Sequence, residues 1–309
     1  MNSHETLLTV KDLVTRFDIR SGIFRQVSHR VHAVESASFE IGVGETLALV
    51  GESGSGKSTI GRSILQLDMP RSGSVNFDGK ELLGLSHKEL RPFRKRAQII
   101  FQDPFGSLDP RMTVGRIIAE PMIIHGEVKK DELRERVLNL LERVELGSEH
   151  MSRYPHAFSG GQRQRICIAR VLGLNPSLII ADESVAALDV TIQAQVINLL
   201  MDLQAEQKIS FLFISHDMAV VERIAHRVAV MYAGEIVEIG GRRDVFNNAQ
   251  HSYTKKLLRS VPVADPRQRR RSREINTDEI SSVIHPVSYE PVHLPFRHVK
   301  DNHYVREEL

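Results

Sequence analysis

Cysteine is almost absent from this sequence of 309 residues, which contains only Cys167. A single cysteine cannot form an intramolecular disulfide, nor a multi-cysteine metal or iron–sulfur site, and such scarcity fits a reducing compartment. Cys167 lies in an apolar stretch with helical spacing, so we expect it to fill the core.

Long apolar runs and a strong charge imbalance are also missing. No stretch approaches the roughly 18 consecutive apolar residues that a membrane span requires, and residues 1–10 lack the basic and apolar regions of a signal peptide. We therefore expect a chain that neither crosses a membrane nor is exported. The net charge of +2 gives no reason to expect nucleic acid as the main partner, and we interpret the Arg-rich residues 267–274 as a solvated linker.

The order of the apolar segments predicts an α/β fold. Alternating, β-favouring residues up to residue 51 predict a β-rich N-terminal layer that ends in a buried strand. Residues 103–158 have helical spacing and almost no strand signal, which predicts a helical insertion. Strands then alternate with helices, which indicates a mostly parallel sheet covered on both faces. Periodicity fades near residue 250, so we divide the chain into a domain over 1–250 and an extension over 251–309.

The strongest motif is GESGSGKS at residues 51–58, which matches G-x-x-x-x-G-K-S/T between an apolar strand and a helical pattern. Backbone N–H groups of such a loop can surround nucleotide phosphates, while Lys57 supplies a positive charge and the Ser58 hydroxyl suits Mg²⁺. A mere Gly/Ser-rich turn would leave Lys57 and the preceding strand unexplained. We predict ATP or GTP binding by Gly51, Ser53, Gly54, Gly56, Lys57, Ser58 and Thr59.

Two further predicted strands end in polar residues that suit phosphate chemistry. SLIIADE brings Asp182 to the end of one strand, where its carboxylate suits Mg²⁺, and places Glu183 beside it as a group that can orient or deprotonate water. FLFISHD places His216 at the end of another buried strand, and we expect this imidazole at the same sheet edge. Adjacent carboxylates are also found as helix N-caps, and a histidine at a strand end is more often structural, so both assignments depend on the P-loop upstream.

A second anion-binding turn is predicted at SGGQ, residues 159–162, where two glycines open a helix. Together with Gln102 in FQDP, these motifs resemble those of the ATP-binding subunits of ABC transporters over about residues 6–250. The resemblance implies a P-loop ABC ATPase with the β-rich layer, the central sheet and a helical subdomain over about 103–158. It also implies ATP and Mg²⁺ as cofactors. The implied Mg²⁺ ligands are Ser58, Gln102 and Asp182, and the implied catalytic residues are Glu183, His216 and Gln102.

The same resemblance gives the second turn its own role, because in the family this turn closes over the nucleotide held by a partner subunit. The residues expected to contact ATP across such a head-to-tail dimer are Ser159, Gly160, Gly161, Gln162 and Asp189. Phe17 occupies the place of the aromatic residue that stacks on adenine. Two positions depart from the family pattern: Phe158 replaces the usual leucine before SGGQ, and Ala186 replaces a common serine in AALD.

Within the family, the sequence is most similar to peptide-type importers of oligopeptides, dipeptides and glutathione, especially to the C-terminal ATPase half of glutathione importer subunits. RYPHAFSGGQRQRICIARVL and HSYTKKLLRSVPVADP are among the stretches that carry this similarity. It implies a peripheral protein on the cytoplasmic face of the inner membrane that hydrolyses ATP to power solute import. The implied partners are an identical or homologous second ATPase subunit, two transmembrane permease subunits and, indirectly, a secreted solute-binding protein. The resemblance also implies a groove that receives a short cytoplasmic helix of the permease, and we expect its walls at residues 105–120.

Two alternative functions share part of these motifs. A soluble ABC-type ATPase acting on nucleic acid or ribosomes would share the ATP residues, but usually has tandem cassettes or a long coiled coil. A P-loop kinase would share only residues 51–58. In the extension the histidines have no regular ligand spacing, so we predict no bound zinc, and the absence of cysteine beyond residue 167 excludes the cysteine cluster of many oligopeptide-type relatives. The prediction concerns the four histidines nearest the end of the sequence, which lie among prolines: His285, His293, His298 and His303.

Overall fold

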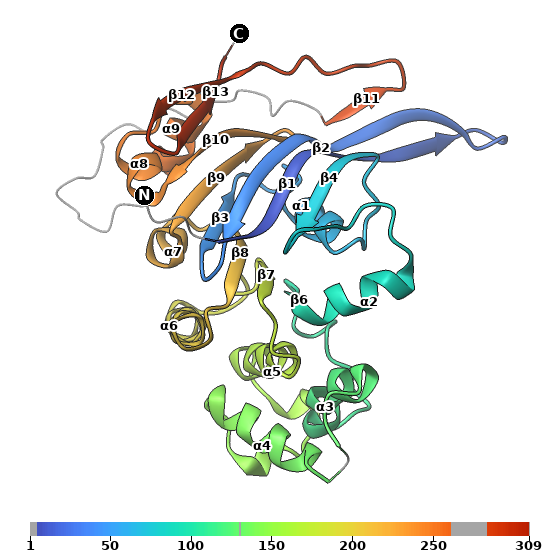
Figure 1. Cartoon of the computed structure of the whole chain (residues 1–309), viewed down its shortest axis with the longest axis vertical. Helices are drawn as coiled ribbons and strands as arrows, with labels where there is room; N and C mark the ends of the chain where they lie inside the picture. Colours follow the sequence, from blue (N-terminus) through green and yellow to red (C-terminus); the bar gives the residue numbers. More distant parts are fainter. Residues whose placement is uncertain (1–4, 130, 261–282, 309) are drawn as a thin grey trace. The chain divides into compact units, whose positions relative to one another are not determined.

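The computed structural model describes residues 5–129, 131–260 and 283–308, which form two compact units (Figure 1). Unit 1 comprises Met1–Thr9, Glu40–Leu47 and Asn76–Ser215, and unit 2 comprises Val10–Phe39, Ala48–Val75 and His216–Leu309. The Arg-rich residues 267–274 lie outside the described residues. The predicted division at residue 250 stays a prediction.

Unit 1 contains three neighbouring parallel strands, β6 (Ala97–Ile100), β7 (Leu178–Asp182) and β8 (Ser210–Ser215). β7 lies between the other two, with Ile180 opposite both Ile99 and Leu212. Every residue of β7 and β8 is buried, which explains why both strands are nearly continuous apolar runs. The α/β prediction and the expected parallel pairing are thus confirmed.

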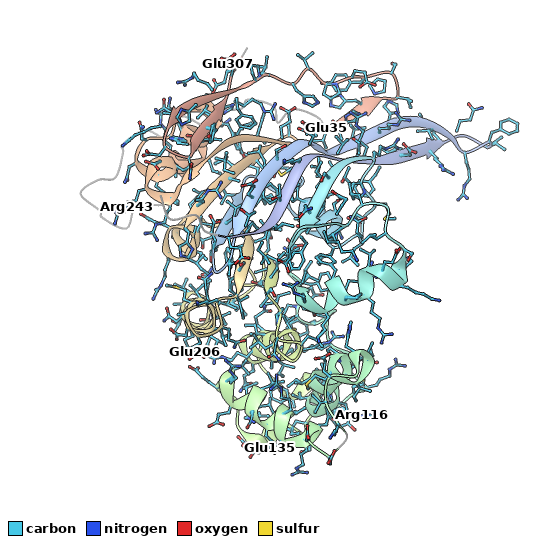
Figure 2. All side chains as sticks on the ribbon, viewed as in Figure 1. Glu35, Arg116, Glu135, Glu206, Arg243 and Glu307 are labelled. Atoms are coloured by element: carbon cyan, nitrogen blue, oxygen red, sulfur yellow. The ribbon has the colours of Figure 1, made fainter. Side chains whose placement is uncertain are left out.

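Most helices of unit 1 lie in the segments whose spacing predicts helix, but α2 lies outside them. Both α3 and α4 pack against α5, and each buries one apolar face that includes Ile118 on α3 and Leu141 on α4 (Figure 1). Charged residues lie on their exposed faces: Arg116 on α3 and Glu135 on α4 are exposed, as is Glu206 on α6 (Figure 2). The end of α3 also exposes two apolar side chains, Ile123 and Ile124. The helices are α2 (His87–Arg96), α3 (Val114–His125), α4 (Leu133–Arg143), α5 (Gly160–Leu172) and α6 (Val190–Gln207), with short 3₁₀ helices η1 (Ser148–His150) and η2 (Pro155–Ala157).

Unit 2 contains most of a long antiparallel layer. Its strands are β1 (Thr6–Ser21), β2 (Gln26–Gly42), β4 (Ser72–Phe77) and β11 (Ile284–Pro286), of which β1, β2 and β4 begin or end in unit 1, where β4 pairs with β5 (Lys80–Glu81). The strand β3 (Thr46–Val50) leads into helix α1 (Lys57–Ile64). This strand–loop–helix order is the one that the sequence predicts around residues 51–58.

The C-terminal part of unit 2 has more regular structure than the sequence pattern indicated. β9 (Arg227–Tyr232), β10 (Glu235–Gly241), β13 (His303–Arg306) and β12 (Phe296–Lys300) are neighbours in that order and pair antiparallel. Three helices accompany them: α7 (Met218–Ile224), α8 (Arg242–Asn247) and α9 (Ser252–Ser260). The described part of the extension is therefore docked by backbone pairing.

A buried polar pair fixes β13 to β10. His303 Nε2 lies 2.7 Å from Glu238 Oε1, and the two side chains are 1 % and 0 % exposed. Glu238 also accepts hydrogen bonds from the backbone N–H groups of Gln250 and His251. These bonds offset the cost of burying a carboxylate.

Two expectations about composition can be compared with the described residues. Cys167 is buried, as expected of a core residue, and burial raises the pKa of its thiol to about 12. Among the described residues, no helix combines the length and the apolar character needed to span a membrane.

Candidate nucleotide-binding site

The loop over residues 51–58 adopts a conformation that only glycine accommodates at two places. Gly51 has φ of 151°, and a Cβ there would lie 2.1 Å from the carbonyl oxygen of Met231. Gly56 has φ of 105°, and its Cβ would lie 1.9 Å from the carbonyl oxygen of Ala33. Because both obstacles are backbone atoms, they cannot move aside as a side chain could. The tight course of the loop is therefore set by its neighbours in unit 2.

Lys57 begins α1 and is 4 % exposed. Its Nζ donates to the carbonyl oxygens of Gly51 at 2.9 Å and Glu52 at 2.6 Å, and to Ser55 Oγ at 3.3 Å. These acceptors offset the desolvation of the ammonium group. The loop thus holds a buried positive charge at the start of a helix whose N-cap, Gly56, offers no side-chain cap. Such a helix end attracts anions.

A residue that the sequence analysis missed touches this loop. Tyr253 on α9 is 7 % exposed, and its hydroxyl accepts a hydrogen bond of 2.9 Å from the backbone N–H of Glu52. The Tyr253 ring packs against Tyr232 with 4.4 Å between centroids. Burial raises the pKa of Tyr253 to about 12, so the hydroxyl stays protonated near neutral pH. The region after residue 250 thus contributes directly to the shape of the loop.

Phe17 lies on the face of β1 that contacts the P-loop helix. Thr15 and Ser63 of α1 are both buried, with their hydroxyl oxygens 2.9 Å apart. Because side chains two residues apart share a strand face, Phe17 lies on the same face as Thr15. Its ring is 39 % exposed. An exposed aromatic on this face suits stacking on a base, and that role stays a prediction.

His216 directly follows Ser215, the last residue of β8, as the sequence predicts. The His216 side chain is exposed, and the next residue, Asp217, caps α7 by accepting from the N–H groups of Ala219 and Val220. Asp217 is therefore a helix cap, a role that the sequence analysis did not assign to it. The catalytic assignment of His216 stays a prediction.

In unit 1, two of the predicted catalytic residues are brought together. Gln102 Nε2 donates to Glu183 Oε2 at 2.8 Å, although 81 residues separate them. Glu183 has φ of 45°, a left-handed conformation that is uncommon for residues other than glycine, and its N–H donates to the carbonyl of Ile214 at 3.0 Å. Asp182, immediately before it, ends β7 and is 7 % exposed. An unusual backbone at a paired carboxylate suggests a functional position.

The structure corrects one detail of this group. The segment AQIIFQ, residues 97–102, predicts a strand that ends at Gln102, but β6 ends at Ile100. Gln102 lies two residues further on, in an exposed loop. Its side chain is positioned by Glu183 and not by strand pairing.

The SGGQ turn forms the N-terminus of α5, as predicted. Ser159 Oγ accepts from the N–H of Gln162, and Gln162 Oε1 accepts from the N–H of Ser159, which makes a reciprocal capping box. A Cβ at Gly161 would lie 2.3 Å from Ile192 Cγ2, whereas a Cβ at Gly160 would meet only Leu188, at 3.8 Å. A side chain at position 161 would therefore have to displace Ile192. Gly160 has space around it.

Asp189 caps the next helix, α6. Its Oδ1 accepts from the N–H of Ile192 at 3.0 Å, and the side chain is exposed. The same Ile192 contacts Gly161, so the AALD segment and the SGGQ turn are linked by one residue. The expected contacts of Asp189 across a dimer stay a prediction.

Two family models match this sequence. The model described as "ABC transporter" matches residues 34–186, which include the P-loop, Gln102, SGGQ and the Asp182–Glu183 pair. The model described as "Oligopeptide/dipeptide transporter, C-terminal region" matches residues 237–283. The chain belongs to the ABC transporter family.

Among ABC transporter proteins, the chain is similar to glutathione import ATP-binding proteins named GsiA. It is 57 % identical over 305 residues to the one from Salmonella paratyphi A and 56 % identical over 301 residues to the one from Pectobacterium atrosepticum. These alignments cover 99 % and 97 % of this chain, but 49 % and 48 % of the relatives. The chain thus spans about half the length of the curated relatives it matches.

Solved ABC cassettes share the fold. A dimeric ATP-binding cassette in a post-hydrolysis state, bound to ADP and Pi, is 29 % identical with a TM-score of 0.68, covering 77 % of this chain and 99 % of that one. The cbiO1 protein of Clostridium perfringens, part of an ABC transporter complex, is 29 % identical with a TM-score of 0.67, covering 79 % of this chain and 92 % of that one. The predicted ABC cassette fold is confirmed.

The two departures from the family pattern lie in different surroundings. Phe158 is 5 % exposed and packs against His150, with 5.3 Å between ring centroids, and beneath the guanidinium of Arg153. The ring therefore fills a core position before the SGGQ turn. Ala186, by contrast, is exposed. Nothing in the structure explains the alanine there.

Unit 1 also contains a cavity of about 240 Å³. Ser107 and Glu120 belong to the predicted groove segment 105–120 and line this cavity, as does Ile124 just beyond it. Arg170, which also lines the cavity, links these two residues, because it donates to the Ser107 carbonyl at 3.0 Å and to Glu120 Oε2 at 2.9 Å. Leu108, in contrast, is 2 % exposed and belongs to the core.

Proposed function

We propose that the chain binds and hydrolyses ATP with Mg²⁺ and thereby powers the import of peptides or a related solute such as glutathione. The observation that carries the hydrolytic part is the 2.8 Å hydrogen bond between Gln102 Nε2 and Glu183 Oε2. An amide and a carboxylate held side by side after the neighbouring parallel strands β6 and β7 are suited to orient a water molecule. Family membership supports the choice of ATP.

The course of the P-loop supports phosphate binding. At Gly51 and Gly56 even one additional methyl group would overlap neighbouring backbone, so only glycines let the loop keep this course, which leads into the N-terminus of α1. Lys57 holds its ammonium group against the loop carbonyls, from which it can extend to the β and γ phosphates.

The residues proposed for Mg²⁺ also match its chemistry. Ser58 offers a hydroxyl oxygen, Asp182 a carboxylate and Gln102 an amide oxygen, and Mg²⁺ prefers such hard oxygen ligands. Bound Mg²⁺ would offset the negative charge of the β and γ phosphates. Because the Gln102 amide nitrogen donates to Glu183, its oxygen remains the atom suited to a cation.

The reaction assigned to these residues is attack by water on the γ-phosphorus. The bond from that phosphorus to the bridging oxygen of ADP breaks, the water oxygen bonds to phosphorus, and Glu183 orients the water and accepts its proton. Gln102 restricts the Glu183 carboxylate to the productive direction, while Lys57 and His216 bind the γ-phosphate oxygens. Positioned general bases of this kind contribute about 10²-fold to 10⁴-fold.

The test replaces the carboxylate of Glu183 by an amide. Glu183→Gln should lose about 10²-fold to 10⁴-fold of the ATP hydrolysis rate while retaining ATP binding. The matched control is Glu135→Gln, at an exposed position on α4, which should leave both unchanged. Hydrolysis by Glu183→Gln at the rate of the control would refute the assignment.

We further propose a head-to-tail dimer with an identical or homologous ATPase subunit. Ser159, Gly160, Gly161, Gln162 and Asp189 would contact the nucleotide held by the P-loop of the partner. A helix N-terminus with an open glycine supports this role, because backbone N–H groups near Gly160 can be approached closely. A stable dimer of Glu183→Gln with ATP, detected by light scattering, would support it, and a monomer under saturating ATP would contradict it.

The assembly we propose also contains two transmembrane permease subunits and, indirectly, a secreted solute-binding protein. The chain would then lie on the cytoplasmic face of the inner membrane as a peripheral protein, and a short cytoplasmic helix of the permease would dock at the cavity beside Glu120 and Arg170. Ile124 lines this cavity and is 57 % exposed, while its neighbour Ile123 is 60 % exposed and does not line it. Ile124→Asp should therefore abolish co-purification with permease subunits, and Ile123→Asp should not. Retention of the permease by both variants would place the contact elsewhere.

A further inference from the structure

The end of the β1–β2 hairpin departs from the usual composition of a tight turn. The N–H of Arg25 donates to the carbonyl of Gly22 at 3.1 Å, so Ile23 and Phe24 are the two central residues of a β-turn. Turns of this kind favour Gly, Pro, Asn, Asp and Ser, whose backbone preferences or side-chain hydrogen bonds stabilise them. Here two large apolar side chains take their place.

Neither apolar side chain contributes to the core. Ile23 is 98 % exposed and Phe24 is 86 % exposed. The hairpin also extends past β11, which pairs with β2 only at residues 29–31 (Figure 1). A sequence choice that violates a local rule without gaining burial is expected where residues serve an external contact.

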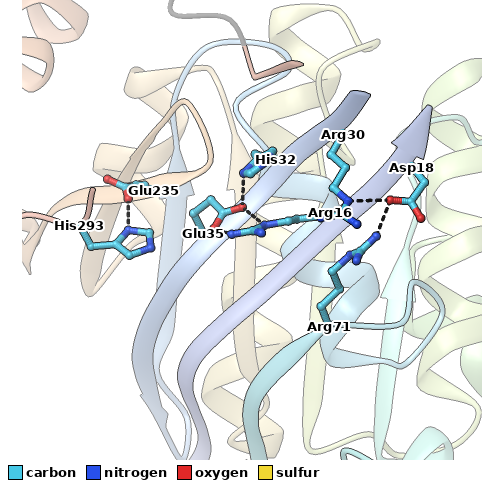
Figure 3. A network of polar contacts seen from close by, with 8 residues as sticks. All are labelled: Arg16, Asp18, Arg30, His32, Glu35, Arg71, Glu235 and His293. Carbon is cyan, nitrogen blue, oxygen red and sulfur yellow. Dashed lines mark hydrogen bonds and ion pairs between the residues drawn. The ribbon is translucent and has the colours of Figure 1, made fainter. Parts of the chain in front are cut away.

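The hairpin end is also basic. Residues 19–34 contain three arginines and no Asp or Glu. Arg20 and Arg25 are exposed and flank the two apolar residues. The acid that precedes this stretch, Asp18, is engaged by Arg30 at 3.1 Å and by Arg71 at 2.5 Å (Figure 3). The positive charge next to Ile23 and Phe24 is therefore not offset by acidic residues of the hairpin end.

We propose that the hairpin tip, residues 20–26, binds the surface of an anionic phospholipid membrane. Ile23 and Phe24 enter the boundary between headgroups and acyl chains, and Arg20 and Arg25 contact lipid phosphates. A membrane surface offers an apolar interior to Ile23 and Phe24 and anionic headgroups to the arginines, so it matches the tip in both polarity and charge. Binding to such a surface does not require a shaped pocket. The choice of a membrane as the binding partner rests on the proposed transporter function. The exposure of Ile23 and Phe24 and the positive charge beside them are observed independently of that function.

The absence of tryptophan allows a direct test, because Phe24→Trp introduces a single fluorophore into the full chain. With vesicles of phosphatidylcholine and phosphatidylglycerol, its emission should shift to shorter wavelength, and with phosphatidylcholine alone it should stay nearly unchanged. Met69→Trp is the matched control, since Met69 is 68 % exposed and lies away from the tip in sequence. Its emission should not respond to either vesicle. An unchanged emission of Phe24→Trp with anionic vesicles would overturn the proposal.

Vesicle co-sedimentation separates the two contributions. Ile23→Ser with Phe24→Ser keeps residues that turns favour, so the fold should persist, and binding to anionic vesicles should fall about tenfold or more. Arg20→Gln with Arg25→Gln should cause a similar loss, and added salt should weaken the wild-type binding. Arg116→Gln with Arg134→Gln removes two exposed arginines elsewhere and should have little effect.

Three outcomes would overturn the lipid assignment. Equal binding of wild type to neutral and anionic vesicles would exclude the charge recognition, and unchanged binding of both tip variants would exclude the tip. If wild type does not bind vesicles while the tip variants lose co-purification with permease subunits, the tip contacts protein instead.

Basal ATP hydrolysis should be the same in wild type and tip variants. A chain that binds vesicles but hydrolyses no ATP would refute the proposed function and leave the lipid proposal standing.

Discussion

The two glycine-containing turns of this cassette differ in how their shape is secured. In the P-loop, Gly51 and Gly56 have positive φ and face backbone carbonyls at distances that no Cβ could occupy. The SGGQ turn is instead an ordinary helix start, closed by the Ser159–Gln162 capping box. One turn is held by backbone from elsewhere in its unit, and the other largely by itself.

This difference matches the two proposed roles. A loop that binds a nucleotide within its own subunit benefits from a rigid cradle, because the cradle need not reorganise. A turn that meets the nucleotide of a partner must be stable both before and after that contact, and a capped helix start provides this. Tyr253 adds to the support of the P-loop from elsewhere in unit 2, because it accepts a hydrogen bond from Glu52 N–H. The space beside Gly160 leaves the backbone of the SGGQ turn open to a partner's nucleotide.

The largest effect is expected for Gly56→Ala. Its Cβ would meet the Ala33 carbonyl, and left-handed backbone strain adds about 1–3 kcal/mol. We expect a marked loss of thermal stability together with loss of ATP binding. Gly54→Ala is the control: φ is 81°, but nothing lies within 4 Å of its Cβ, so only the strain remains. Equal unfolding temperatures of the two variants would show that the backbone contact does not matter.

The second prediction compares the two glycines of SGGQ. Gly161→Ala should lower stability by about 1–3 kcal/mol, because the methyl group overlaps Ile192. Gly160→Ala should leave stability unchanged or raise it by up to about 1 kcal/mol, since alanine favours helix. Its ATP hydrolysis should nevertheless fall if a nucleotide approaches this backbone. Urea unfolding and ATPase rates measure both effects, and wild-type hydrolysis by Gly160→Ala would contradict the dimer role.

The sequence predicted the parts of the cassette in which local pattern and structure coincide. β7 and β8 are recognisable because strands buried on both faces are continuous apolar runs, and the P-loop because its glycines and Lys57 have fixed spacing. β13 was not recognisable. His303 appears polar in any pattern, and only its pairing with Glu238, 65 residues earlier, explains its burial.

The candidate site shows the same limit. The sequence identified Glu183 and Gln102 through a family resemblance, but not their mutual hydrogen bond, which spans 81 residues. Tyr253 carries no motif signal that points to the P-loop, since its contact is with a backbone N–H and any sequence provides that donor. Motif spacing thus identifies the residues that can perform the chemistry. The contacts that position those residues are known only from the tertiary structure.

A third prediction asks whether the capping box of SGGQ is only structural. Ser159→Ala should cost about 1 kcal/mol of stability, because it removes the acceptor for the Gln162 N–H. Ser159→Asp caps at least as well, so stability should be retained, but its negative charge should repel a partner's phosphates and lower hydrolysis. Unfolding by urea and ATPase rates distinguish the two variants. Normal hydrolysis by Ser159→Asp would mean that phosphate does not approach this turn.

The smallest effect is expected for Tyr253→Phe, which tests the external support of the P-loop. The ring should still pack on Tyr232, while the Glu52 N–H loses its acceptor, at a cost of about 1 kcal/mol. Because the change loosens the loop and leaves Glu183 untouched, KM for ATP should rise a few-fold at nearly constant kcat.

Tyr304→Phe, at a tyrosine that is 40 % exposed on β13, serves as the control for hydroxyl loss and should leave KM unchanged. A pH series sharpens the test of Tyr253. Burial raises the pKa of this hydroxyl to about 12, so it remains protonated up to about pH 10, and the difference in KM between wild type and Tyr253→Phe should stay constant from pH 7 to that limit. If Tyr253→Phe instead lowers kcat at unchanged KM, the hydroxyl does not act by shaping the binding loop. The contrast between an externally held P-loop and a self-capped SGGQ turn would then rest on the glycines alone.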